Sequence, residues 1–165
     1  MSDPELLRDV GMAYASLLGP GSSLVNHKFD RVAGIPVAAL PLATAASLTT
    51  GIPMIFPRMQ AKEHGTGLQI EGEYKAGEEA LLLDDLITTG KSKIEALAIL
   101  KAGGLQVRHL VVLLERGAQG RKDMAAEGIE LHAFAHISEF LPLCQDMGLI
   151  SAEERKSLEA YAGKQ

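Results

Sequence analysis

Residues 81–92 read LLLDDLITTGKS, and the fold that we expect for the chain follows from this stretch. An apolar run of strand length leads into two carboxylates, then a turn with hydroxyls and a glycine, then a helix start. In parallel α/β sheets, ligands bind beyond the carboxyl ends of the strands. We therefore expect Asp84 and Asp85 to stand at the end of a strand, beside a helix that begins near Ser92.

The turn after the two carboxylates is suited to phosphate. Free N–H groups and the helix dipole attract anions to a helix N-terminus. Thr88, Thr89 and Ser92 add hydroxyl donors, and Gly90 lets the backbone approach an anion closely. Carboxylates accept hydrogen bonds from sugar hydroxyls and can hold a hydrated Mg²⁺. The stretch thus predicts a site for a phosphorylated sugar; the alternative is a solvated acidic turn that only caps a helix.

Gly90, Lys91 and Ser92 also match the end of the P-loop of ATPases, but the match stops there. The P-loop requires a glycine five positions before Gly90, and Asp85 stands at that position. We therefore reject a P-loop and keep Lys91 as a point charge near the phosphate.

Short apolar strands alternate with helical segments along the rest of the chain, which is typical of an α/β fold with a mostly parallel sheet flanked by helices. We expect one domain over residues 1–165. The predicted strands are 23–28, 31–35, 54–56, 68–71, 73–75, 80–83, 107–114 and 129–135. The predicted helices start at Pro4, capped by Asp3, then cover 37–50, 92–102 and 121–127, and start again at Ser138 and at Ser151, where Ser-Ala-Glu-Glu matches a capping box.

Composition excludes several classes of protein. The net charge of −5, from 16 basic and 21 acidic residues, argues against nucleic acid as a partner. No run reaches the roughly 18 apolar residues of a membrane span, so we expect no membrane partner. The one cysteine, Cys144, excludes an internal disulfide and is expected to be a small buried residue. A cytoplasmic location is the expectation.

Four histidines lack a supporting motif in the sequence. His27, His109, His132 and His136 are expected to be surface or strand-end residues without a site role. His132 and His136 are four apart, but the first falls on a predicted strand, so helical metal-ligand spacing does not apply.

Residues 81–92 resemble the phosphoribosyl-pyrophosphate (PRPP) signature of type I phosphoribosyltransferases, and further stretches resemble the orotate branch, including the matching domain of UMP synthases. Residues 32–44 resemble the loop and helix that receive pyrophosphate. Residues 58–67, followed by Ile70-Glu71-Gly72, resemble the mobile catalytic loop and the strand after it. Residues 111–116 resemble the strand that ends in a base-contacting arginine, and residues 128–133 continue the match.

The resemblance implies transfer of phosphoribosyl from PRPP to orotate, with Mg²⁺ as cofactor, in pyrimidine biosynthesis by a homodimer. It implies catalytic roles for Arg58, Lys62, His64 and Asp85, and orotate contacts for Thr88 and Arg116. The first three would close over the pyrophosphate as a cationic lid that also excludes water. Asp84 and Asp85 would hold the ribose hydroxyls and reach Mg²⁺ indirectly. The implied PRPP-binding residues are Arg58, Lys62, His64, Asp84, Asp85, Leu86, Ile87, Thr88, Thr89, Gly90, Lys91 and Ser92.

The chain departs from the family pattern at two places. Met59 replaces the lysine that usually follows the loop arginine, so we expect weaker PRPP binding or turnover. The resemblance begins at the first helix, so we expect the chain to lack the N-terminal segment that helps enclose the substrates in family members. Two alternatives therefore stand beside the enzyme: a non-catalytic PRPP- or nucleotide-binding regulatory module, and a phosphoribosyltransferase for another base.

Overall fold

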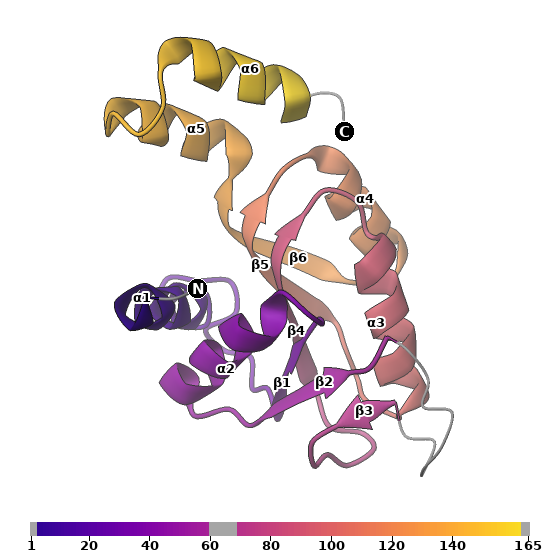
Figure 1. Cartoon of the computed structure of the whole chain (residues 1–165). Helices are drawn as coiled ribbons and strands as arrows, with labels where there is room; N and C mark the ends of the chain where they lie inside the picture. The colour runs from indigo at the N-terminus through magenta and orange to yellow at the C-terminus, as the bar shows by residue number, and fades with distance from the viewer. Residues whose placement is uncertain (1–2, 60–68, 163–165) are drawn as a thin grey trace.

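A central sheet organises the computed structural model, which describes residues 3–59 and 69–162 (Figure 1). Within those residues the sheet has six strands in the order β3-β2-β1-β4-β5-β6. All neighbours run parallel except β2 and β3, which are antiparallel. The expected mostly parallel α/β fold is therefore confirmed. The strands are β1 (Arg31–Gly34), β2 (Met54–Pro57), β3 (Ile70–Glu71), β4 (Ala80–Ile87), β5 (His109–Glu115) and β6 (Glu130–His136).

Helices cover both faces of the sheet. In Figure 1, α1 and α2 lie on one side of it and α3 and α4 on the other. The last two helices, α5 and α6, pack against each other beyond β6. The helices are α1 (Pro4–Ser16), α2 (Ala39–Thr50), α3 (Lys91–Ala102), α4 (Ala118–Ala126), α5 (Ile137–Asp146) and α6 (Ala152–Ala162).

The apolar run at the start of β4 supplies both halves of the core. Successive side chains of a strand point to opposite faces of the sheet. Leu82 therefore joins the cluster under α3 and α4, whereas Leu81 and Leu83 join the cluster under α1 and α2. All three are 0–1% exposed. Burial on both faces explains why this strand is continuously apolar instead of alternating.

Predicted helix starts are confirmed at both ends of the chain. The carboxylate of Asp3 accepts hydrogen bonds from the backbone N–H groups of Glu5 and Leu6, at 2.8 and 3.4 Å. Before α6, Ser151 Oγ accepts from the N–H of Glu154 at 3.2 Å, and Glu154 Oε2 accepts from the N–H of Ser151 at 2.8 Å. This reciprocal pair is the capping box expected from the sequence.

Two predicted strands are wrong. Residues 23–28 form turns, closed by bonds such as His27 N–H to the Leu24 carbonyl at 2.9 Å. Residues 73–75 form no strand, because side chains take their backbone groups: Arg31 Nε donates to the carbonyl of Glu73, and Lys75 N–H donates to the carboxylate of Glu78. Side-chain partners thus satisfy two of the backbone groups that a strand ladder would otherwise pair.

Two further expectations change. Strand β4 continues through the acidic pair to Ile87, so Asp84 and Asp85 lie inside the strand and not after it. Cys144, on α5, is only partly buried, so its expected place in the core is wrong.

Within residues 3–59 and 69–162, none of the helices combines the length and the apolar character that crossing a membrane requires.

Candidate active site

The expected site residues that the structure describes lie in the last part of strand β4 or directly after strands that end at one edge of the sheet. Strands β1, β2, β4 and β5 run parallel and end at Gly34, Pro57, Ile87 and Glu115. The segments that come next therefore share this carboxyl edge: 35–38, Arg58, 88–92 and Arg116. Lys62 and His64 lie outside the described residues, so their expected roles stay predictions.

The acidic pair occupies the last half of β4. Asp84 is 5% exposed, and its Oδ1 accepts a hydrogen bond from the backbone N–H of Asp85 at 2.9 Å. Asp85 is partly buried, and its Oδ1 accepts from the N–H of Leu86 at 2.7 Å. The Tyr14 hydroxyl, from α1, donates to the Asp84 carbonyl at 2.7 Å and fixes this part of the strand.

Sequence reasoning missed the residue that pairs with Asp84. Lys93 Nζ, from α3, lies 2.6 Å from Asp84 Oδ2, and both side chains are less than a tenth exposed. Burial raises the pKa of Asp84 above its ordinary value, because removal of water disfavours the charged carboxylate; the ammonium of Lys93 opposes this. A sequence signal existed: Lys93 shares the buried face of α3 with Ala96, Leu97 and Leu100, at helical spacing. A lysine on an apolar helix face requires a buried partner.

The turn 88–90 leads into α3, which begins at Lys91. The N-cap residue is Gly90, and among the described residues no side-chain hydrogen bond caps this helix; Thr89, Lys91 and Ser92 are exposed. Lys93 Nζ also lies 3.4 Å from Ser92 Oγ, so one ammonium joins the acidic pair to the turn. These features fit an anion at the helix N-terminus.

Gly90 has a packing role that the sequence did not reveal. A Cβ at this position would lie 2.7 Å from Asp123 Cβ and 2.8 Å from Met124 Cε, both on α4. The N–H of Gly90 donates to Asp123 Oδ2 at 2.9 Å. This hydrogen bond lowers the pKa of Asp123. The close approach of α4 is therefore a sufficient reason for glycine here.

Arg58 stands at the base of the expected catalytic loop. Its Nε lies 3.2 Å from Glu71 Oε1, and its backbone N–H donates to the carbonyl of Gln69 at 2.7 Å. The two described ends of the loop are thus joined. Met59, which replaces the expected lysine, packs against the core cluster under α3 and α4. An apolar side chain suits that position, although it supplies no charge to a substrate.

Arg116 follows β5 and is positioned by its neighbours on either side. Its N–H donates to the carbonyl of Ile87 at 2.9 Å, which places it beside the turn after β4. Its guanidinium carbon lies 5.3 Å from the centre of the Tyr161 ring, on α6. This cation–π contact covers Arg116 with the last helix. A cavity of about 340 Å³ lies beside it, lined also by Gly117, His136 and Ser138.

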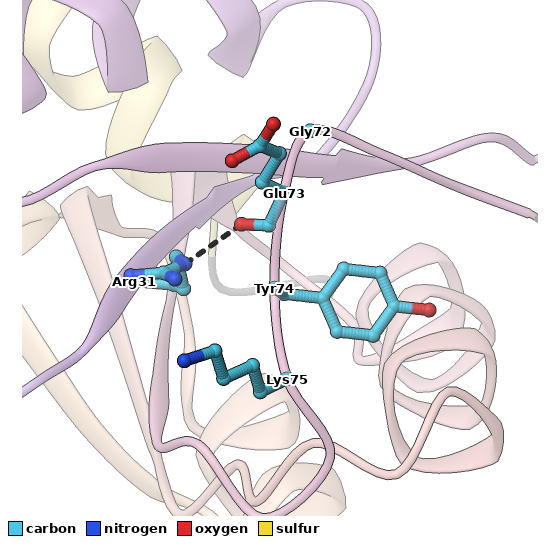
Figure 2. Close-up of a pocket in the computed structure, with 5 residues that line it drawn as sticks. All are labelled: Arg31, Gly72, Glu73, Tyr74 and Lys75. Carbon is cyan, nitrogen blue, oxygen red and sulfur yellow. Dashed lines mark hydrogen bonds between the residues drawn. The ribbon is translucent and has the colours of Figure 1, made fainter.

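A second hollow lies away from this edge. Figure 2 shows Arg31, Gly72, Glu73, Tyr74 and Lys75 around it, with the Tyr74 ring directed away from Arg31. Arg31 begins β1, so the hollow belongs to the amino end of that strand. Its guanidinium is held by the carbonyl of Glu73 at 2.9 Å and by Glu78 Oε1 at 3.0 Å. These contacts give Arg31 a structural role.

The strand order of the sheet and the residues at its carboxyl edge can now be compared with those of known proteins. Residues 5–138 match the phosphoribosyl transferase domain family. The chain is 40% identical to the orotate phosphoribosyltransferase of Pyrococcus furiosus over 139 residues, which cover 84% of this chain and 74% of the relative. It is 36% identical to the Natronomonas pharaonis orotate phosphoribosyltransferase, over 85% of this chain and 76% of that protein. The chain therefore belongs to the orotate phosphoribosyltransferase family.

Larger proteins contain a similar region. The bifunctional enzyme PyrF/PyrE of a Nostoc species is 38% identical over 97% of this chain, which spans 32% of that protein. The structure of Leishmania donovani UMP synthase superimposes with a TM-score of 0.86 at 35% identity, over 98% of this chain and 34% of that one. The chain thus spans about a third of the length of these relatives and about three quarters of the single-function ones.

Proposed function

We propose that the chain transfers the phosphoribosyl group of PRPP to orotate and releases pyrophosphate, as a step of pyrimidine biosynthesis. The observation that carries this is 36–40% identity to proteins named orotate phosphoribosyltransferase, over 84–85% of the chain. In the reaction, the bond between ribose C1 and the pyrophosphate oxygen breaks, and a bond from C1 to an orotate ring nitrogen forms as that nitrogen loses its proton to the departing pyrophosphate or to water. The oxygen keeps its electron pair, and orotidine 5′-phosphate is the product.

The turn 88–92 would hold the 5′-phosphate at the N-terminus of α3. Thr88, Thr89 and Ser92 would donate hydroxyl hydrogen bonds, and Lys91 would add charge. Asp84 and Asp85 would accept hydrogen bonds from the ribose hydroxyls. In this arrangement Lys93 is a positioning residue, because its ammonium holds Asp84 at 2.6 Å and reaches Ser92 at 3.4 Å.

Departure of pyrophosphate places negative charge on the leaving group and positive charge on the ribose. We propose that Arg58, Lys62 and His64 stabilise the leaving group, and that closure of their loop excludes water. Bound Mg²⁺ would neutralise part of the pyrophosphate charge. The acidic pair would hold this ion only indirectly. One oxygen of Asp84 already contacts Lys93, and the other already accepts a hydrogen bond from the N–H of Asp85. The ribose hydroxyls would therefore stand between the acidic pair and the ion.

Orotate would lie between the turn after β4 and Arg116. The planar guanidinium suits a ring that carries a carboxylate. The contact of Arg116 with the Ile87 carbonyl supports this placement, because it holds the arginine beside Thr88. The comparisons give support to orotate as the base and none to a regulatory module.

A direct assay tests the proposal. Purified chain is mixed with PRPP, Mg²⁺ and orotate, and the loss of orotate absorbance is followed. Turnover is expected, with at least a 100-fold loss in an Asp84→Asn, Asp85→Asn double variant. Saturable PRPP binding without turnover would overturn the proposal and favour the regulatory module.

Two finer expectations belong to the same proposal. We propose a homodimer, which light scattering tests; a strictly monomeric species at assay concentration contradicts it. We also propose a cytoplasmic location. A single cysteine in the chain suits a reducing compartment, and cell fractionation is the test.

A further inference from the structure

A cluster of histidines occupies the amino edge of the sheet, opposite the proposed substrate site. His109 is the first residue of β5, and Glu130 and His132 lie on β6. The strand register pairs His109 with Glu130. No motif in the sequence links these histidines, but the fold joins two of them, His109 and His132, which are 23 residues apart in the sequence.

The distances in this cluster suit one metal ion. His109 Nδ1 lies 3.1 Å from His132 Nε2. Glu130 supplies one oxygen 3.6 Å from His109 Nδ1 and the other 3.8 Å from His132 Nε2. Two nitrogens bound to the same tetrahedral Zn²⁺, with bonds near 2.0–2.1 Å, are about 3.3 Å apart. We propose that His109, His132 and Glu130 bind a divalent transition-metal ion of the Zn²⁺ type.

The surroundings orient these ligands. Ser23 Oγ lies 3.0 Å from His132 Nδ1, so a hydrogen bond at that nitrogen directs Nε2 towards His109 and Glu130. Partners of this kind fix the tautomer and the ring orientation of metal-binding histidines. The His27 ring packs edge-on against His109, with the ring centres 4.5 Å apart. Ser23 and His27 lie in the turns after α1, so the proposed ion would tie this segment to β5 and β6.

Burial and ligand type decide which ions the cluster takes. The side chains of His109 and His132 are 7% and 9% exposed, whereas that of Glu130 is 62% exposed. An ion can therefore enter along Glu130 and keep a water molecule as its fourth ligand. Burial also lowers the pKa of both histidines, which favours the neutral rings that bind metals. Two imidazoles and one carboxylate favour Zn²⁺, Co²⁺ or Ni²⁺ over Mg²⁺.

The competing explanation is a plain hydrogen bond. At 3.1 Å, a neutral His109 and a neutral His132 can share one proton without any ion. The two explanations differ in one measurable property, the affinity for added metal. The inference is independent of the proposed transfer reaction, because the cluster lies at the other edge of the sheet.

Metal titration of the full chain tests the inference. The chain is freed of any affinity tag, treated with EDTA, exchanged into clean buffer and titrated with Zn²⁺ at pH 7.5 by calorimetry. One Zn²⁺ per chain with micromolar or tighter affinity is expected, together with visible absorption bands of tetrahedral Co²⁺. His109→Gln and His132→Gln should each weaken Zn²⁺ binding at least tenfold, and Ser23→Ala about tenfold.

Two variants make the test decisive. Glu130→Gln changes an exposed side chain, so it should fold normally and still bind Zn²⁺ at least tenfold more weakly. His136→Gln is the matched control, because His136 lies at the other end of β6 and bonds to Ser138 instead of the cluster. Its Zn²⁺ affinity should equal that of the wild type. Absence of saturable Zn²⁺ binding, or equal affinity in all variants, overturns the inference.

Discussion

Lys93 Nζ lies 2.6 Å from Asp84 Oδ2, and this buried ion pair links α3 to the strand that carries the acidic pair. The same ammonium lies 3.4 Å from Ser92 Oγ in the first turn of α3. One lysine therefore holds the proposed ribose-binding and phosphate-binding groups in a fixed relation. Pairs of this kind contribute little net stability, but loss of one partner leaves an uncompensated buried charge.

Removal of Lys93 should destabilise the fold. Lys93→Met leaves the Asp84 carboxylate without its partner, and the expected loss in unfolding free energy is about 3–5 kcal/mol. Urea unfolding measures it. Lys91→Met makes the same change at an exposed position two residues away and should stay within about 0.5 kcal/mol of the wild type. A double variant, Asp84→Asn with Lys93→Met, should lose less than the sum of its parts; additive losses would show that the two side chains do not interact.

The effect of Lys93→Met should depend on pH. Burial already raises the pKa of Asp84, and loss of the ammonium raises it further. A folded-state pKa above the unfolded value of about 3.9 means that the folded state binds the proton more tightly. Protonation therefore favours folding, and the penalty of the variant grows as pH rises. The loss of unfolding free energy should be smaller at pH 5 than at pH 7.5. Equal losses at the two pH values would show that the variant loses stability through packing alone.

Asp85 should matter to PRPP and little to folding. Its side chain is partly buried and accepts a hydrogen bond from the backbone N–H of Leu86. The side-chain oxygen of an asparagine can still accept that hydrogen bond. Asp85→Asn should weaken PRPP binding by at least tenfold in calorimetry and leave the melting temperature nearly unchanged. Asp146→Asn, at an exposed position on α5, is the control and should change neither quantity. Equal losses of binding and stability would make the acidic pair structural.

Gly90 should tolerate no side chain. A Cβ there would meet Asp123 and Met124 on α4 at 2.7 and 2.8 Å. Gly90→Ala should therefore cost about 1–3 kcal/mol of unfolding free energy, the usual cost of overpacking. Gly19→Ala is the matched control, because the nearest atom to its added Cβ lies 3.5 Å away. If the Gly90→Ala chain is as stable as the wild type but binds PRPP weakly, the glycine serves to let the backbone approach the anion and not to let α4 pack.

Substitution of Arg116 should weaken the binding of orotate and leave the binding of PRPP unchanged. Arg116→Lys keeps the charge but loses the planar pair of donors. We expect KM for orotate to rise about 10–100-fold, as for a lost hydrogen bond to a charged group, with PRPP affinity unchanged. Tyr161→Phe keeps the ring that contacts the guanidinium and should leave KM close to the wild-type value. A parallel loss of PRPP affinity in Arg116→Lys would contradict the assigned contact.

Much of the fold was predictable because local patterns carried it. The continuous apolar run before Asp84 indicated a strand buried on both faces, and the caps at Asp3 and Ser151 marked helix starts that the structure confirms. The two wrong strand predictions fall where local turns or side chains take the hydrogen bonds of the backbone. Residues 23–28 and 73–75 resemble strands in composition, yet turns and side-chain hydrogen bonds occupy their backbone groups.

The α/β class and the acidic pair with the turn after it could be predicted from the sequence, because these depend on residues close together in the chain. The family resemblance could be predicted too, because each of the motifs that carry it is a short continuous stretch. The side-chain partners of these residues depend on the tertiary structure. Lys93 reaches Asp84 because α3 packs back on β4, Asp123 closes on Gly90 because α4 approaches the turn, and His109 meets His132 because β5 and β6 pair in one register. Contacts between distant residues depend on packing and strand register, which no local pattern encodes.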